Sequence, residues 1–108
     1  MIHQLKIKSQ YFEQIRTGVK TFEIRRNDRE FHVGDYLGLN EITKHPCNAE
    51  GENRETGNSI LVKVLNVFDD PDFVKEGFVI MSIKPCGIME TPHVYANVYR
   101  EMERQNDG

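Results

Sequence analysis

Five short runs of apolar or alternating residues, each bounded by turn-forming residues, limit most strongly what this chain can fold into. They cover residues 2–7, 20–25, 36–42, 60–67 and 78–83, and runs of this length and period are typical of β-strands. Most of them lie too close together for helical crossovers between them. The pattern therefore predicts a mainly β domain of the α+β class, a small and partly open barrel of five or six strands.

Two or three short helices are expected beside these strands. Ser9 can cap a short helix with an apolar stripe, and Gly18 can end it in the left-handed conformation. Residues 69–77 resemble a single helical turn closed by glycine. Residues 43–58 are polar and without periodicity, and are predicted to form a long loop.

The last part of the chain, residues 85–108, is predicted to be a helical extension that packs on a barrel domain of residues 1–84. Thr91 is a good N-cap and Pro92 suits the first helical position. An apolar stripe at helical spacing follows, made of Val94, Tyr95, Val98, Tyr99 and Met102. Packing on the same domain is the favoured role of this stripe, and a homodimer contact or another protein partner is the alternative.

Length and composition place the chain among globular domains. It has 108 residues, of which 38% are hydrophobic and 29% charged, enough for one hydrophobic core but not for two domains. No apolar stretch approaches the roughly 20 residues that span a bilayer, and the N-terminus lacks the pattern of a secretory signal. We therefore expect a cytoplasmic protein with no membrane partner.

Cysteine and histidine usage gives little support for a metal site. Without an export signal, Cys47 and Cys86 are expected to be reduced thiols. Together with His45 and His93 they could form a zinc site, but the spacings are not the usual ones. No metal and no cofactor is predicted.

Charge is distributed unevenly along the chain. The net charge is −3, yet residues 1–30 carry seven lysines and arginines against four acidic residues. If the fold gathers these cations, they can attract anions locally. A solvated, salt-bridged surface would explain the same pattern.

The run at residues 20–25 is expected to have two unlike faces. Phe22 and Ile24 are predicted to face the core, and Thr21, Glu23 and Arg25 to face the opposite way. The full set of predicted core residues is Phe22, Ile24, Leu39, Val62, Val64 and Val79.

Several polar residues have expected local roles. Glu23 and Arg25, two residues apart, can form a structural ion pair. His3 is predicted to be packed and hydrogen-bonded, and Asp35 to bond nearby backbone in its turn. Asn27 and Asp28 are more typical of a turn than of a ligand site.

The segment at residues 18–29, GVKTFEIRRNDR, is followed by Phe31 and by Val33-Gly34-Asp35. This pattern resembles the signature of the ASCH-like members of the PUA-like superfamily, in a bacterial and phage branch, and the resemblance covers about residues 1–84. It implies a PUA-like β-barrel with a cleft beside it, in which the Lys, Glu and Arg of the motif meet. It also implies an RNA or nucleotide ligand.

Two functions follow from the resemblance and the residue chemistry. The favoured one is binding of single-stranded RNA or a nucleotide in a basic cleft, with phosphates on the arginines and a base stacked on an aromatic residue. The predicted binding residues are Lys6, Lys20, Arg25, Arg26, Asn27, Arg29 and Tyr36.

The alternative is a hydrolase acting on a modified nucleoside or on RNA. Lys20 and Glu23 would transfer protons and Arg25 would stabilise developing negative charge. In the resembling branch that deacetylates N4-acetylcytidine, a threonine stands third after the lysine, whereas here that position is Glu23. A carboxylate cannot replace a hydroxyl nucleophile by the same route.

Overall fold

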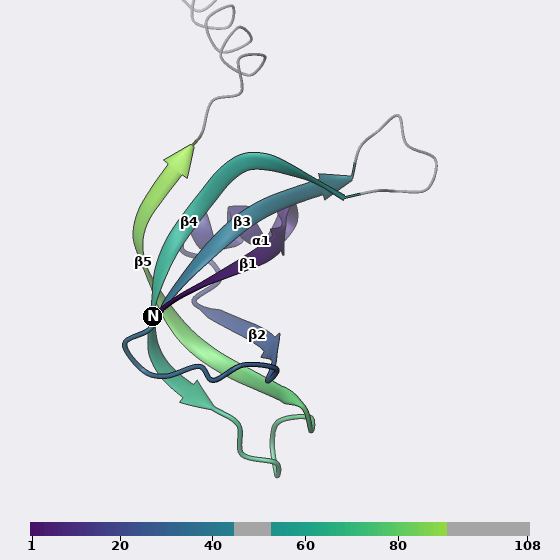
Figure 1. The fold of residues 1–108 in the computed structure, drawn as a ribbon, viewed down its shortest axis with the longest axis vertical. Coiled ribbons are helices and arrows are strands. Elements are labelled where there is room, and N and C mark those ends of the chain that lie inside the picture. The colour runs from purple at the N-terminus through teal and green to yellow at the C-terminus, as the bar shows by residue number, and fades with distance from the viewer. Residues whose placement is uncertain (45–52, 91–108) are drawn as a thin grey trace, which may run out of the picture.

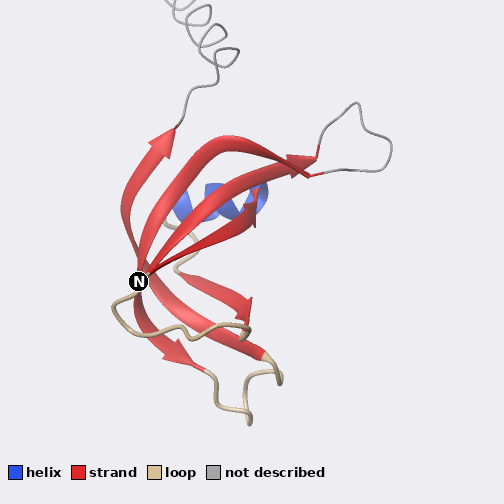
Figure 2. Cartoon of the chain, viewed as in Figure 1, coloured by secondary structure: helices blue, strands red, loops and turns tan. Residues whose placement is uncertain are grey.

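The computed structural model describes residues 1–44 and 53–90, and this part of the chain is mainly β (Figures 1 and 2). All five predicted strands are present. The elements in chain order are β1 (Ile2–Lys8), α1 (Ser9–Arg16), β2 (Phe22–Arg26), β3 (Tyr36–Lys44), β4 (Asn53–Phe68) and β5 (Phe78–Glu90).

The five strands form one curled sheet in the order β1-β3-β4-β5-β2. β1 and β3 are parallel, and the other neighbouring strands are antiparallel. The long strands β4 and β5 bend, with register shifts along their pairing, and they carry the sheet round into a half-barrel (Figure 1). β1 and β2 are therefore the two edges of the sheet, and the barrel is open between them.

The described residues contain one helix, α1, beside the curled sheet (Figure 2). The single helical turn predicted within residues 69–77 is present as turns that do not extend into a helix, and Gly77 follows with a φ of 84°. The side chain of Asp70 accepts the N–H of Asp72 at 2.9 Å, and its carbonyl accepts those of Phe73 and Val74. One residue thus satisfies three successive donors, which closes a turn without continuing as a helix.

α1 has the expected end and an unexpected start. It buries Phe12 and Ile15, and Gly18 follows it with a φ of 82°, the left-handed conformation expected of it. Ser9, predicted as the N-cap, is instead the first helical residue. Its hydroxyl donates to the carbonyl of Ile42 at 3.1 Å and so ties the helix to β3.

Three strands are each longer than predicted by two residues or more. β3 and β4 extend into the predicted loop of residues 43–58, and the Thr56 and Asn58 side chains donate to Oε1 of Glu41 across this part of the ladder. β5 continues to Glu90 and so passes the predicted domain boundary at residue 84. The predicted C-terminal helix and its apolar stripe lie outside the described residues.

The core prediction was right for four residues and wrong for two. Leu39, Val62, Val64 and Val79 are at most 1% exposed, whereas Phe22 is 43% and Ile24 52% exposed. The faces of β2 are therefore reversed, since Glu23 is 2% exposed and stands opposite the buried Met81 of β5.

Asp35 fastens the start of β3 to β1 and to the preceding turn. Its carboxylate accepts a bond from Nε2 of the buried His3 at 2.8 Å and one from the backbone N–H of His32 at 3.0 Å. The ring of His3 also contacts that of Phe31 edge-on, with centroids 4.8 Å apart. Both predictions, a packed His3 and an Asp35 that bonds nearby backbone, are confirmed.

Among the described residues, no helix has the length and apolarity needed to cross a membrane.

The Asp35 contacts predict loss of stability in acid. The bond from His3 lowers the pKa of the Asp35 carboxyl to about 2, helped by the His32 N–H and opposed by burial. Because an unfolded aspartate titrates near pH 4, this stabilisation is complete above about pH 4 and is lost as the pH falls towards 2. We expect Asp35→Asn to be less stable than the parent at pH 7, with a difference that shrinks over this interval. Urea unfolding at several pH values measures the difference in free energy of unfolding between the two proteins. A difference that does not change between pH 4 and pH 2 would show that the Asp35 carboxylate is not the stabilising group.

Candidate functional site

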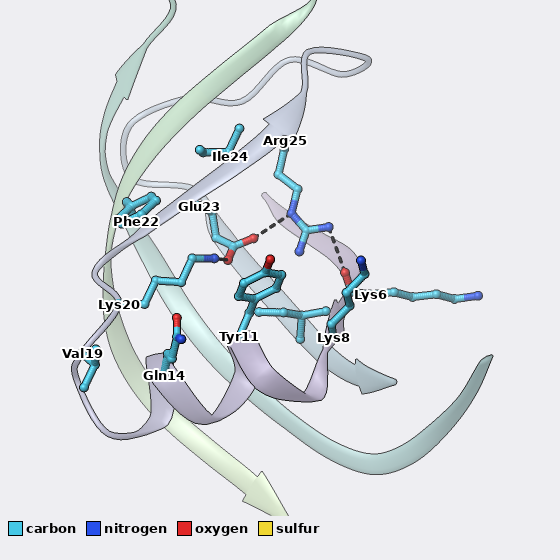
Figure 3. Close-up of a pocket in the computed structure, with 11 residues that line it drawn as sticks. Lys6, Lys8, Tyr11, Gln14, Val19, Lys20, Phe22, Glu23, Ile24 and Arg25 are labelled. Atoms are coloured by element: carbon cyan, nitrogen blue, oxygen red, sulfur yellow. Dashed lines mark hydrogen bonds and ion pairs between the residues drawn. The ribbon is translucent and has the colours of Figure 1, made fainter. Parts of the chain in front are cut away.

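A cleft of about 520 Å³ lies at the open seam of the half-barrel, between β1, α1 and β2 (Figure 3). β1 contributes residues 6–8, and α1 contributes Tyr11 and Gln14. The turn after α1 contributes Val19 and Lys20, and β2 contributes residues 22–25. The cleft is thus built almost entirely from the first quarter of the chain.

A buried carboxylate joins two cations in this cleft. Nζ of Lys20 donates to Oε1 of Glu23, and Nε of Arg25 donates to Oε2, each at 2.7 Å (Figure 3). The Glu23 side chain is 2% exposed, against 14% for Lys20 and 21% for Arg25. A buried carboxylate is stable only when it is paired and hydrogen-bonded, so the three side chains fix one another's positions.

The local backbone explains why these three residues meet. After Gly18 turns the chain, the N–H of Lys20 donates to the carbonyl of Gln14 at 3.0 Å, which brings Lys20 back against α1. Glu23 and Arg25 are two residues apart on β2 and so share a strand face. That face points towards the inside of the half-barrel, where Glu23 is buried.

Arg25 also links the two edges of the sheet. Its Nη1 donates to the backbone carbonyl of Lys6 on β1 at 2.9 Å (Figure 3). Among the described residues the edges β1 and β2 are not backbone partners, so a side chain spans the seam. An unpaired strand edge is thereby partly covered.

Two partly exposed aromatic rings stand beside Lys20. Its Nζ lies 4.9 Å from the ring centroid of Tyr11 and 5.4 Å from that of Phe22, within cation–π range. Tyr11 is 38% and Phe22 43% exposed. Each ring therefore has surface available to a ligand.

The cleft is cationic although the chain as a whole is acidic. Its lining holds the cations Lys6, Lys8, Lys20 and Arg25 and the single carboxylate of Glu23, an excess of three positive charges against a net −3 for the chain. Lys6 and Lys8 are exposed and form no ion pair with any described residue. Two cations are thus free to meet an anion.

The structure brings together four of the predicted site residues and separates the others. Lys6, Lys20, Glu23 and Arg25 line the cleft. Arg26 follows Arg25 on β2, so its side chain lies on the other face of the strand, where it stacks 5.5 Å from the ring of a phenylalanine on β5.

The remaining three predicted binding residues lie elsewhere. Asn27 and Arg29 follow the end of β2 and line a different hollow. Tyr36 pairs with Ile2, at the opposite end of β1 from the cleft. Tyr11 and Phe22, and not Tyr36, are the aromatic residues that line the cleft.

Sequence reasoning missed Lys8, Tyr11 and Gln14 as cleft residues. Lys8 shares a strand face with Lys6 at a spacing of two, and Tyr11 and Gln14 share a helix face at a spacing of three. These spacings could have suggested two small surfaces. Only the tertiary fold shows that both surfaces line one cleft with Lys20.

Apart from the phenol of Tyr11, the described lining of the cleft holds no hydroxyl or thiol that could act as a nucleophile. None of its described lining residues is Ser, Thr or Cys, and Thr21 is absent from the lining although it lies between Lys20 and Phe22. This weighs against acyl transfer to a serine- or threonine-type nucleophile.

Metal ligands do not gather in the described part of the chain, where no cluster of three His, Cys, Asp or Glu residues could hold an ion. Cys86 is an exposed free thiol. Cys47, His45 and His93, the other members of the zinc site considered from the sequence, lie outside the described residues.

Comparison with known families matches residues 2–83 to the domain of unknown function DUF3850. The chain belongs to the DUF3850 family. The matched region contains every residue that lines the cleft. The cleft is therefore part of the DUF3850 domain.

The chain is also similar to the uncharacterized 12.9 kDa protein in the GpA 3′ region of Escherichia phage P2. The two are 28% identical over 75 residues, which is 69% of this chain. The aligned region spans 62% of the phage protein's length.

Proposed function

We propose that the cleft of this DUF3850 domain binds RNA or a nucleotide, with phosphate on its cations and a base on its aromatic rings. The observation that supports this most is the placing of four cations and two partly exposed rings in one cleft of an acidic chain. Cations attract the phosphate backbone, and aromatic rings stack on bases of any sequence.

The arrangement around Glu23 suits binding because it holds the cations in place before a ligand arrives. Arg25 uses Nε and Nη1 for bonds to Glu23 and Lys6, and Nη2 has no bond to a described residue. Side chains already fixed in the binding geometry lose less entropy when they bind. Arg25 can thus offer a fixed donor, and Lys6 and Lys8 can offer mobile charges.

We infer in addition that the domain is an ASCH-like member of the PUA-like superfamily. Support comes from the GxKxxExR pattern at residues 18–25, from the curled five-stranded sheet with a helix beside it, and from the meeting of Lys20, Glu23 and Arg25 in one cleft. A fold of this kind does not fix the function, so the binding proposal rests on the cleft itself.

Binding to RNA should be salt-dependent. Each phosphate contact with single-stranded nucleic acid adds about −0.7 to the slope of log affinity against log salt. We expect Lys6→Ala to weaken binding and flatten this slope, because Lys6 lines the cleft and its side chain forms no ion pair with a described residue. Lys63→Ala removes an exposed lysine of β4 outside the cleft and should change neither quantity. Fluorescence anisotropy with a labelled single-stranded RNA measures both, and affinity independent of salt would contradict phosphate recognition.

A second candidate function, hydrolysis of a modified nucleoside or RNA, is favoured by the 2.7 Å contact between Nζ of Lys20 and Oε1 of Glu23 in a partly buried cleft. Such a pair is placed for proton transfer. Since the cleft lining lacks a hydroxyl or thiol nucleophile other than the Tyr11 phenol, water would be the attacking group. Arg25 would stabilise the developing negative charge.

The hydrolase candidate predicts a loss of turnover in two variants. Lys20→Met and Glu23→Gln should each lower the rate by about 10²- to 10⁴-fold, the usual contribution of a general acid or base. Lys63→Ala serves as the control. Assays would use RNA and N4-acetylcytidine with the parent protein, and circular dichroism would confirm folding of each variant. Absence of turnover in the parent, or undiminished turnover in both folded variants, would rule out this role.

A further inference from the structure

We infer that the cleft accepts a single nucleotide unit with its phosphate, either free or at the end of a strand, and not a run of nucleotides inside a continuous strand. This inference rests on the proposed nucleotide-binding function and narrows its ligand. It is argued from the dimensions of the cleft, from the contacts that border it and from the positions of the neighbouring cations.

The cleft is short along both strands that border it. β1 contributes three consecutive residues, 6–8, and β2 contributes four, 22–25. At a rise of about 3.3 Å per residue these edges are roughly 7 and 10 Å long, comparable with one nucleotide. The volume of about 520 Å³ lies within the range of about 300 to 1,000 Å³ found for small-molecule sites.

Contacts within the protein border the cleft on two sides. On one side the turn that precedes β2 is held to α1 by the bond between the N–H of Lys20 and the carbonyl of Gln14. At the seam, the bond from Arg25 to the carbonyl of Lys6 joins β2 to β1 (Figure 3). A nucleic-acid strand that crossed the cleft would have to pass these two connections.

The cations that follow Arg25 in the chain do not extend the cleft into a continuous positive groove. Arg26 shares a face of β2 with Phe22 and Ile24 but does not line the cleft, and its guanidinium lies 5.5 Å from the ring centroid of Phe78. Arg29 lies in another hollow, where its Nε is 3.4 Å from Oδ1 of Asp28. Proteins that bind single strands without sequence preference present a continuous positive groove with successive stacking residues, and that continuity is missing among the described residues here.

The polar and aromatic groups of the cleft are divided between its walls. Lys6 and Lys8, the cations free of ion pairs with described residues, belong to β1, whereas Tyr11 and Phe22 belong to α1 and β2. The side-chain amide of Gln14 lies on the wall with Tyr11 and has no bond to a described residue. One nucleotide fits this division, with its phosphate towards β1 and its base on the rings.

The test compares ligands of different length and charge on the intact chain. Isothermal titration would use ribonucleoside monophosphates, the matching nucleosides, and single-stranded RNAs of increasing length with a terminal phosphate. We expect the monophosphates to bind, and neither the affinity nor the salt slope to grow with strand length. Strands that bind as well as a monophosphate would indicate a strand end as the ligand, and strands that bind much more weakly would indicate a free nucleotide.

Matched variants separate the phosphate from the base. Tyr11→Leu should weaken monophosphate and nucleoside alike by roughly 10-fold, as expected for loss of a stacked ring. Lys8→Ala should weaken the monophosphate but not the nucleoside, and Lys63→Ala should weaken neither. Because the three residues are exposed, the variants should fold as the parent does.

Two results would overturn the inference and are distinguishable. Affinity and salt slope that rise with each added nucleotide would show binding along a strand, and would leave RNA binding itself intact. Failure of both monophosphates and RNA to bind would overturn the proposed function together with this inference.

Discussion

The carboxylate of Glu23 is buried at the seam of the half-barrel and held between Lys20 and Arg25, each 2.7 Å away. Taking a carboxylate out of water is unfavourable by several kcal/mol unless cations and hydrogen bonds compensate it. Both oxygens of Glu23 are compensated in this way. This arrangement holds the turn before β2 and the cleft wall against the strand, and β2 itself is also held by its ladder with β5.

The same arrangement explains how an open barrel maintains a defined cleft. The two edge strands β1 and β2 are not backbone partners, and Arg25, oriented by Glu23, reaches across to the Lys6 carbonyl. A closed backbone ladder would leave no space at this point. A side-chain bridge leaves the cleft open beside it, and lysines of β1 and the two aromatic rings line that space.

The sequence predicted the strands and much of the core because both depend on local patterns. The apolar phases of Leu39, Val62, Val64 and Val79 are visible in single strands. Which face of β2 is buried was not predictable in this way, because the alternation of residues 22–25 is the same whether Phe22 and Ile24 or Glu23 and Arg25 point to the core. Burial of Glu23 becomes favourable only when Lys20, brought back by the turn at Gly18, supplies a second cation.

Other differences arise from interactions between distant segments. The polar start of β4 is a strand because of its pairing with β3 and the bonds from Thr56 and Asn58 to Glu41, which no local pattern records. Tyr11 joins the cleft because the turn after α1 brings Lys20 back against the helix, with its Nζ 4.9 Å from the centroid of the Tyr11 ring. The meeting of Lys20, Glu23 and Arg25 in one cleft was expected from the family resemblance, and not from periodicity.

The buried Glu23 and its cations should stabilise the cleft as a unit, and a double-mutant cycle measures whether they do. Lys20→Met, Glu23→Gln and the double variant would be unfolded with urea beside the parent. We expect a coupling energy of about 1 to 3 kcal/mol between the two positions, as for contacting residues that share a network. The exposed pair Glu13 and Arg16 on α1, treated in the same way, should show no measurable coupling. A Lys20–Glu23 coupling as small as that of the exposed pair would contradict the account.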